Sequence, residues 1–590
     1  MNKNLHINKK KILVFNLFLL LCILVILLKT SFQDQIIPTT CFSVSSLDYE
    51  GYVNIYCKTN SSDIPVLKLY LNKDKGYFFL PSCTKFEDFS FQFNEDEYLI
   101  TINNVQIHSQ DSLTAFSLNE EYQMCITNPH SVSANSSNYT LTFMQSDNLP
   151  SIFINTESNS IDRLNLSKAN SESGTFVCIM TDGSMDSHGF LSKISCHGNS
   201  SFDEANKKSY QITFYNATDI LSMGSATKYI LQANAFDPTY MRNKLVYDFC
   251  NEMGMPYTVD SEYVDLYFNG EYTGNYLLCE KVELGNNRID ISNGYLIEKV
   301  WHARVTDNEA SFNVDKTEYF IVKEPTVVSQ DEIDYLTSYM NMLENKISSC
   351  ASYAQYEELS EYINIDSFID MYLINAITND IDSNIASTYY YKMSEESGGQ
   401  LYAGPVWDYD KALGGDRRGR NIALSAYPSG YCEELFKIKY FKDAVIDKFN
   451  QTVYPLSTQY NSNFIIAADA YICNSRMMDS CRWENRTIEN TGDDTYDEAV
   501  SELEDYMQSR LELVNDYLNH PEEYHDVVFI NMNEEPLYRD SEYWISDGES
   551  IPDKILSAIN ERFHTSNISD ENGNAYNNMP IHTDIILYCK

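Results

Sequence analysis

The sequence predicts an α+β protein in three successive parts, and three observations predict it. Residues 41–145 alternate apolar and polar side chains in short runs separated by Asn, Asp, Ser and Gly, a pattern typical of a β-sandwich. Residues 146–525 combine hairpin patterns with helical stretches, of which residues 498–520 are the most clearly amphipathic. Residues 526–590 remain as a segment short enough for one small module. We therefore expect a β-rich, sandwich-like domain, a larger α+β domain and a small α+β module.

The first 29 residues predict a cytoplasmic tail and an uncleaved signal-anchor helix. An apolar run at residues 12–28 is interrupted only by Asn16, and its length is near the lower limit of about 17–25 residues for a spanning helix. Four lysines precede the run and Lys29 follows it, so we expect a single-pass membrane protein with its remaining chain outside the cytoplasm. Secretion after signal cleavage is the alternative, although no small-x-small cleavage site follows.

Charge and cysteine content agree with an extracytoplasmic location. The formal charge is −43; five of the 42 basic residues and none of the 85 acidic residues lie in the first 29, so the remainder carries −48. Such a surface repels nucleic acid, and we expect no nucleic-acid partner. Disulfides can form outside the cytoplasm. Proximity in the sequence suggests three pairs among the fourteen cysteines: Cys41 with Cys57, Cys83 with Cys125 and Cys178 with Cys196.

In the larger domain, residues 194–214 read as a strand, a small-residue loop and a second strand, and a helix and a hairpin follow. Asp237 and Pro238 suit the first turn of a helix that Gly254 ends. Residues 263–268 and 272–279 read as two strands joined by Asn269-Gly270, the dipeptide that suits primed hairpin turns. Further helices are expected at residues 331–349 and 366–379.

Acidic side chains follow the second of these helices and flank a second hairpin. Residues 387–392 and 400–407 read as its strands. Because a hairpin begins beside the place where it ends, Asp382 at its entry should share one rim with Asp408 and Asp410 at its exit. Carboxylates clustered in this way favour Mg²⁺, which proteins typically hold with one or two carboxylates and substrate phosphates. Loop-capping aspartates that face water are the alternative.

Five ordered blocks resemble the CotH family of atypical, spore-coat-type, secreted or surface protein kinases, over roughly residues 145–450. The blocks are SCHGNSSFDEANKKSYQITF at 195–214, AFDPTYMRNKLVYDFCNEMG at 235–254, YVDLYFNGEYTGNYLLCEKVE at 263–283, GYLIEKV at 294–300 and LYAGPVWDYDKALGG at 401–415. The resemblance implies a kinase-like domain at residues 146–525. It also implies transfer of the ATP γ-phosphoryl, with Mg²⁺ or Mn²⁺, to Ser or Thr hydroxyls of surface or secreted proteins.

The same resemblance implies roles for single residues. Asp382 corresponds to the catalytic Asp, and Asp408 with Asp410 corresponds to the metal-binding motif. Kinases place a further metal-binding Asn five residues after the catalytic Asp, where this chain has Ser387, so Asn384 is the substitute candidate. Asp380 is an alternative to Asn384.

Candidates for nucleotide binding come from the upstream blocks. They are Gly198, Asn199, Lys207, Lys208, Arg242 and Glu280. Backbone N–H groups around Gly198 suit phosphate, and the basic side chains suit its charge. The alternatives are an ordinary hairpin turn at Gly198, solvated lysines, a surface ion pair at Arg242 and an exposed Glu280.

Three positions depart from the family pattern. His197 stands where the family usually has Arg, Gln211 lies in a strand that usually carries a basic residue, and Ser387 replaces the Asn. These departures leave open a pseudokinase, a surface adhesin or scaffold without turnover. A hydrolase that uses the Asp cluster on glycans or phosphates is a third reading. Residues 526–590 loosely resemble a β-grasp-like surface repeat of the Listeria–Bacteroides type, which implies a wall or partner module.

Overall fold

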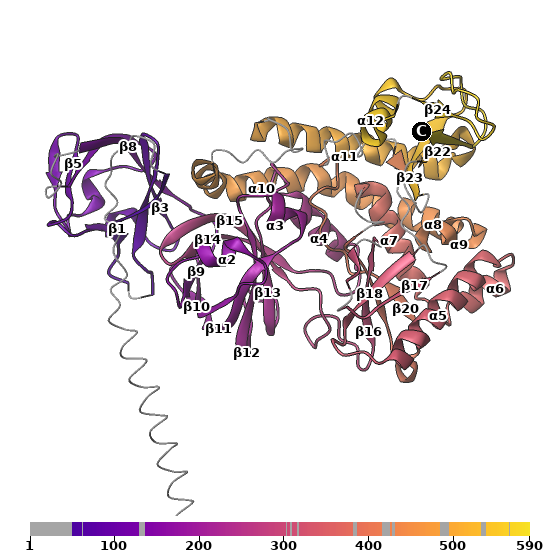
Figure 1. The fold of residues 1–590 in the computed structure, drawn as a ribbon, viewed down its shortest axis with the longest axis horizontal. Coiled ribbons are helices and arrows are strands. Elements are labelled where there is room, and N and C mark those ends of the chain that lie inside the picture. The colour runs from indigo at the N-terminus through magenta and orange to yellow at the C-terminus, as the bar shows by residue number, and fades with distance from the viewer. Residues whose placement is uncertain are drawn as a thin grey trace, which may run out of the picture.

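The computed structural model describes residues 50–61, 63–128, 136–301, 304–306, 309–314, 318–380, 386–415, 425–426, 431–483, 495–532, 538–565 and 567–590. A β-rich N-terminal region, a β-barrel, a helix-backed sheet and a small C-terminal sheet follow one another along the chain (Figure 1). The expected α+β class and β-rich N-terminal region are therefore confirmed. Across these described ranges no helix is long and apolar enough to cross a membrane, and the expected anchor lies outside them.

The N-terminal region contains eight strands in one sheet. They are β1 (Glu50–Lys58), β2 (Leu67–Asn72), β3 (Lys75–Leu80), β4 (Ser90–Gln92), β5 (Leu99–Ile102), β6 (Val105–Ile107), β7 (Glu121–Thr127) and β8 (Ser136–Gln145). Their order is β4-β1-β2-β3-β8-β7-β5-β6, so the two hydrogen-bonded sheets of a sandwich are not formed. The reason is that β3 pairs in parallel with β8 and joins the two halves. Alternating apolar side chains such as Leu69, Phe78 and Phe143 fill a shared core.

Seven strands close the barrel in the order β10-β11-β12-β13-β15-β14-β9. They are β9 (Ser151–Thr156), β10 (Glu172–Ile179), β11 (Met185–His197), β12 (Ser209–Thr218), β13 (Ala226–Gln232), β14 (Ser261–Phe268) and β15 (Glu271–Glu280), with the short helices α2 (Asp162–Leu166) and α3 (Ser200–Glu204) between them. The expected Asn269-Gly270 hairpin is confirmed, since φ is +52° at Asn269 and +79° at Gly270, as a type I′ turn requires.

Helix α4 (Arg242–Glu252) begins later than expected. The Asp237 carboxylate accepts hydrogen bonds from the backbone N–H groups of Thr239 (2.9 Å) and Arg242 (2.8 Å). This local turn competes with the helix and delays its start by several residues. The expected end is confirmed, because Gly254 takes a φ of +78° directly after the C-cap.

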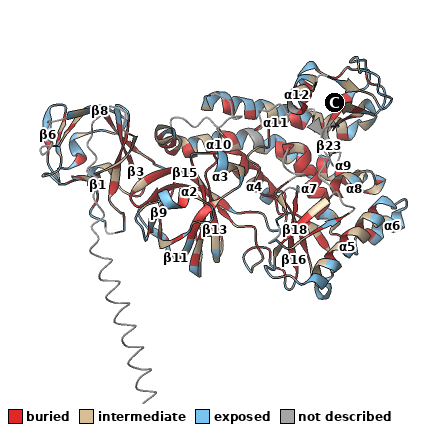
Figure 2. Cartoon of the chain, in the orientation of Figure 1, coloured by how far each residue is buried: buried red, intermediate tan, exposed pale blue. Residues whose placement is uncertain are grey.

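The second sheet lies beside the barrel and is backed by helices. Its strands are β16 (Tyr295–Val300), β17 (Ser311–Val314), β18 (Glu318–Glu324), β19 (Thr388–Lys392) and β20 (Leu401–Ala403), in the order β17-β18-β16-β19-β20. Strands β19 and β20 form the expected antiparallel hairpin, with Tyr390 opposite Ala403. The expected helices are α5 (Gln330–Ser348) and α7 (Ile365–Thr378), and α6 (Tyr353–Leu359) lies between them. Almost every side chain of α7 is buried (Figure 2).

The remaining helices and the last sheet complete the chain. The helices are α8 (Tyr431–Phe436), α9 (Lys439–Lys448), α10 (Tyr454–Arg482), α11 (Tyr496–Asn519) and α12 (Asp553–Phe563). The strands are β21 (Ser425–Ala426), β22 (Tyr524–Asn531), β23 (Tyr538–Ser546), β24 (Ile568–Ser569) and β25 (Ile585–Cys589), in the order β21-β23-β22-β25-β24. A capping box of Thr495 and Glu498 starts α11, which confirms the amphipathic helix expected there.

The expected disulfides differ from the structure. Cys83, Cys125, Cys178 and Cys196 are free thiols, so neither of the two pairs proposed among them is formed. Cys178 on β10 lies opposite Ser187, nine residues before Cys196 on β11, so the strand register keeps these two thiols apart. Cys41 lies outside the described residues, so its pairing with Cys57 stays a prediction.

Candidate functional site: a cleft between the barrel and the second sheet

A cleft of about 260 Å³ lies where the barrel meets the second sheet. Gly198 and Asn199 line it from the barrel side, and Asp408 and Asp410 line it from the segment that follows β20. These four sequence candidates therefore come together in space although the two segments are far apart in the chain.

The barrel side of the cleft is a tight turn between β11 and α3. Gly198 has a φ of +91°, a backbone conformation that is strained for residues with a Cβ, so glycine is strongly favoured at this turn. The Asn199 Oδ1 accepts a hydrogen bond from the Lys168 Nζ at 2.6 Å. The turn therefore brings backbone and a lysine to the same edge of the cleft.

The acidic side is held in place by α4 and α7. The Tyr409 N–H donates to the Asn243 Oδ1 (2.7 Å), and the Tyr409 hydroxyl donates to the Asn375 Oδ1 (3.0 Å). The Asp408 N–H donates to the Tyr247 hydroxyl (3.2 Å). These buried contacts fix the backbone between the two aspartates, so their carboxylates are presented from a rigid segment.

Ser387 extends this arrangement to the entry of the hairpin. Its hydroxyl donates to the Asp408 Oδ2 at 3.2 Å, and it lines the same cleft. Ser387 at the start of the hairpin therefore lies beside Asp408 at its end, whereas the expected rim of Asp382 with Asp408 and Asp410 stays a prediction. Asp382 and Asn384 lie outside the described residues, so their expected roles stay predictions.

Basic side chains that the sequence reasoning missed also line the cleft. They are Lys168, Arg304, Lys323 and Lys411. Lys323 on β18 pairs with Glu298 on β16, with 2.9 Å between Nζ and Oε2. No motif signalled Lys168, Arg304 or Lys323, whereas Lys411 lies inside the block at 401–415 and was not singled out there. The cleft therefore combines the carboxylates of Glu298, Asp408 and Asp410 with ammonium and guanidinium groups from several elements.

His197 lies in this mixed cleft without adding charge. Burial, together with the nearby positive charges of Lys281, Lys168 and Lys323, lowers the pKa of His197 to about 4. The imidazole is therefore neutral at physiological pH. The charge that an Arg would supply at this position is absent, while Lys168 and Lys323 supply charge from neighbouring elements.

The two adjacent lysine candidates have other partners. The Lys207 side chain is only 2% exposed and forms an ion pair with Asp479. Lys208 donates to the carbonyls of Phe202 and Ala205 and so caps the end of α3. Neither side chain lines the cleft, and both stabilise the chain that follows its glycine turn.

Arg242 and Glu280 also lie away from the cleft. Arg242 is buried against Asp237, and its Nε donates to the Ala412 carbonyl at 3.0 Å, which ties α4 to the loop after the acidic segment. Glu280 pairs with Arg288 in a separate cavity of about 430 Å³. Burial raises the pKa of Glu280 to about 7, against the lowering effect of Arg288.

The donor set of the cleft fits a magnesium ion bound together with a nucleotide. Mg²⁺ usually takes one or two carboxylates, water and phosphate oxygens, and Asp408 and Asp410 provide two carboxylates. Within the described ranges, no three His, Cys, Asp or Glu side chains gather as a complete metal site. A cation here would therefore need ligands from a bound phosphate group.

The fold and the cleft define an α+β protein with an acidic segment opposed by a glycine turn and lysines. Residues 194–514, more than half of the chain, match the family model described as CotH kinase protein, and the chain belongs to this family. Inner spore coat protein H of Bacillus subtilis (strain 168) is 26% identical over 225 residues. That match covers 37% of this chain and 58% of the relative, so the chain spans less than two thirds of the relative's length.

One solved structure was also found to be similar in part. It is a Bacteroides thetaiotaomicron protein described provisionally as a glycoside hydrolase, with 12% identity over 49% of this chain and 87% of that chain. Its TM-score of 0.12 is too low to carry an argument about fold or function.

Proposed function

We propose that this chain is an atypical protein kinase that transfers the γ-phosphoryl of ATP to Ser or Thr hydroxyls of surface or secreted proteins. The observation that carries the proposal is the meeting of Gly198 and Asn199 with Asp408 and Asp410 in one cleft. Membership of the CotH kinase protein family supports the same reaction class. The proposed kinase-like fold of residues 146–525 rests on the same two arguments.

The acidic and basic residues of the cleft would have different roles. When bound, a Mg²⁺ or Mn²⁺ ion neutralises charge on the transferring phosphoryl group. Asp408 and Asp410 would hold that ion, while Lys168 and Lys323 would attract the phosphate chain. Asp382, by its place in the family motif, would accept the proton of the acceptor hydroxyl. Positioning and electrostatic stabilisation are the main contributions that phosphoryl transfer needs from a protein.

A catalytically weak surface adhesin or scaffold is the second candidate, and His197 favours it. Its lowered pKa of about 4 leaves this wall of the cleft without the permanent charge of the family's usual Arg. A domain with this change can retain the fold and bind nucleotide without turnover.

The location is part of the proposal. The strongly acidic chain after residue 29 and the apolar run at residues 12–28 support an anchored protein that acts outside the cytoplasm, with secretion as the alternative. The relative, by its name, is a protein of the inner spore coat. A surface or secreted protein is therefore the acceptor that we propose.

Phosphoryl transfer can be tested directly. The purified full-length protein is incubated with γ-labelled ATP and either Mg²⁺ or Mn²⁺, alone and with surface-protein extracts, and label on protein is measured. Metal-dependent label on Ser or Thr supports the kinase. Tight metal-dependent ATP binding without label supports the pseudokinase. If neither ATP binding nor label is found, the kinase and the nucleotide-binding pseudokinase are both excluded, and the adhesin or scaffold remains.

A further inference from the structure

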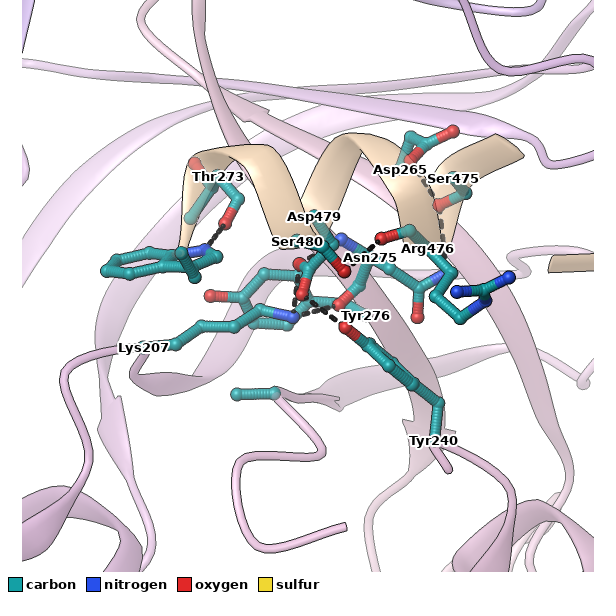
Figure 3. A network of polar contacts seen from close by, with 12 residues as sticks. Lys207, Tyr240, Asp265, Thr273, Asn275, Tyr276, Ser475, Arg476, Asp479 and Ser480 are labelled. Carbon is teal, nitrogen blue, oxygen red and sulfur yellow. Dashed lines mark hydrogen bonds and ion pairs between the residues drawn. The ribbon is translucent and has the colours of Figure 1, made fainter. Parts of the chain in front are cut away.

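A buried polar network joins the chain after the cleft's glycine turn to helix α10 (Figure 3). The Lys207 Nζ lies 2.7 Å from the Asp479 Oδ1, and the two side chains are 2% and 0% exposed. Lys207 also donates to the Asn275 carbonyl on β15. Three segments that are distant in sequence, before β12, on β15 and on α10, therefore share one ion pair.

The other bonds of Asp479 make this ion pair rigid. Its Oδ1 accepts the Asn275 N–H (2.9 Å), and its Oδ2 accepts the Tyr240 hydroxyl (2.8 Å). Gly274 is required beside it, since φ there is +129° and a Cβ would lie 2.2 Å from the Asp479 Oδ1. A buried carboxylate satisfied by several donors has one favoured position.

Aromatic rings complete the surroundings of Lys207. Its ammonium lies 4.6 Å from the centre of the Tyr276 ring and 5.8 Å from that of the Tyr240 ring. These ring contacts replace water around the charge. Leaving this site to reach a phosphate would cost Lys207 all of these contacts and would leave Asp479 buried without its counter-ion.

The network is attached to the chain segment that lines the cleft. Lys207 falls between Ser201 and Ser209, and both of these serines line the cleft. Lys208, the next residue, caps α3. The position of the turn at Gly198 and Asn199 is therefore set from its C-terminal side by the attachment of Lys207 to α10.

We infer that Lys207 is a positioning residue, which holds the glycine turn over the cleft by its ion pair with Asp479. It does not itself contact the nucleotide. This inference rests on the proposed nucleotide site, but the anchoring of the turn can be measured without any nucleotide.

The experiment compares Lys207→Met, Asp479→Asn and the double variant Lys207→Met/Asp479→Leu in the full-length protein. Breaking a buried ion pair leaves one charge unpaired, whereas an apolar pair of similar size can replace it. We expect each single variant to raise amide hydrogen exchange in residues 198–205 at least ten-fold and to weaken Mg·ATP binding. The double variant should recover most of both properties. Lys68→Met, which breaks the Lys68–Glu271 pair (2.7 Å) between β2 of the N-terminal region and β15 of the barrel, should change neither.

Two results would overturn the inference. The first is unchanged exchange in residues 198–205 of both single variants. The second is an Asp479→Asn variant that binds Mg·ATP at least as tightly as the parent while Lys207→Met loses binding, because this pattern identifies Lys207 as a phosphate ligand. Exchange in β9 and β10 reports unfolding of the barrel that carries the turn. If a single variant unfolds, exchange in residues 198–205 of the double variant decides instead. Absence of ATP binding by the parent would refute the proposed function, and the exchange results would still decide this inference.

Discussion

At the residue scale, Asp408 and Ser387 share an uncommon backbone conformation. Their φ angles are +68° and +57°, in the left-handed region where few residues other than glycine are found. Each such residue costs on the order of 1 kcal/mol or more, and such residues persist where surrounding contacts hold them. The Ser387 hydroxyl bonds to the Asp408 carboxylate, so the two conformations support one local geometry in the cleft.

The first prediction separates metal binding from proton transfer. Asp408→Asn should fold, because Asn also tolerates the left-handed region, but it removes a metal-ligand charge. We expect Mg·ATP affinity, measured by titration calorimetry, to fall about ten-fold or more, which corresponds to about 1.4 kcal/mol. Asp382→Asn should instead leave that affinity nearly unchanged and abolish phosphoryl transfer.

The control for both variants is Asp505→Asn, which removes an exposed carboxylate from α11. It should alter neither affinity nor transfer. If Asp408→Asn binds Mg·ATP like the parent, or if Asp382→Asn transfers at the parental rate, the aspartates are capping residues of their loops.

The second prediction concerns the neutral His197. Because its pKa of about 4 leaves it uncharged at pH 7, His197→Arg adds a full positive charge to the cleft. We expect Mg·ATP affinity to rise by a factor of about three to ten, which corresponds to about 0.5–1.5 kcal/mol, the net contribution of one hydrogen bond. His197→Gln, which stays neutral, should leave the affinity near that of the parent. Weaker binding of the Arg variant would show that Lys168 and Lys323 already supply as much positive charge as the cleft accepts.

At the element scale, the β14–β15 hairpin is where the barrel meets the N-terminal region. The Lys68 N–H donates to the Gly270 carbonyl at 2.9 Å, and the Lys68 Nζ pairs with Glu271. A Cβ on Gly270 would lie 2.2 Å from the Val66 carbonyl oxygen. The turn of this hairpin therefore also forms part of the contact between the barrel and the N-terminal region.

The third prediction uses two glycines with nearly equal φ. Gly270→Ala carries the left-handed cost of about 1–2 kcal/mol and the clash with Val66, whereas Gly254→Ala, with φ +78° and no atom within 4 Å, carries the backbone cost alone. We expect thermal melting to fall clearly further for Gly270→Ala, with earlier proteolysis between the N-terminal region and the barrel. Equal melting temperatures would show that the contact between Gly270 and Val66 accommodates the added methyl group without loss of stability.

Elements with strong local signals were predictable, and their boundaries depended on side-chain bonds. The Asn269-Gly270 turn, α7, α11 and the β19–β20 hairpin follow from turn chemistry and periodicity. The start of α4 could not be read from its pattern, since Asp237 bonds to the N–H of Arg242 and makes a turn first. The single N-terminal sheet was missed for another reason, because the parallel pairing of β3 with β8 joins strands distant in the sequence.

At the scale of the whole molecule, Asp265 lies where the barrel meets α10. It is 0% exposed, and its Oδ1 accepts the hydroxyls of Ser475 on α10 (2.7 Å) and Tyr272 on β15 (3.0 Å). Burial raises the pKa of Asp265 to about 6, and the nearby Asp479 raises it further, against the lowering effect of these hydrogen bonds.

The fourth prediction is a pH dependence with a definite sign. A carboxyl with a raised pKa binds its proton more tightly in the folded state than in the unfolded state. Its ionisation therefore lowers the free energy of unfolding as pH rises from about 4 to about 6, and this loss is complete above that range. The two-unit shift corresponds to about 3 kcal/mol. Denaturant unfolding at pH 5 and pH 8 should show lower stability at pH 8, and Asp265→Asn should reduce this difference. A variant with the parental pH dependence would assign the effect to other groups.

The fifth prediction concerns topology. Protein taken from its native membrane should retain residues 1–29 and expose the chain after them to external protease, because four lysines before the apolar run orient it with its N-terminus inside. Intact-mass analysis and protease treatment of whole cells test this. A mature N-terminus between residues 30 and 41 would establish the secreted alternative and leave the kinase proposal unchanged.

The sequence by itself determined the α+β class, the family, the glycine turn and the acidic segment, because each depends on local patterns or on ordered motifs. Only the tertiary structure decided which charged residues share the cleft. Lys207, Arg242 and Glu280 were candidates by motif, yet each is buried against its own counter-ion at Asp479, Asp237 or Arg288. Lys168 and Lys323 had no motif and line the cleft. The physical reason is that a charged side chain pairs with the opposite charge nearest to it in the folded structure, and breaking that pair is costly when both partners are buried.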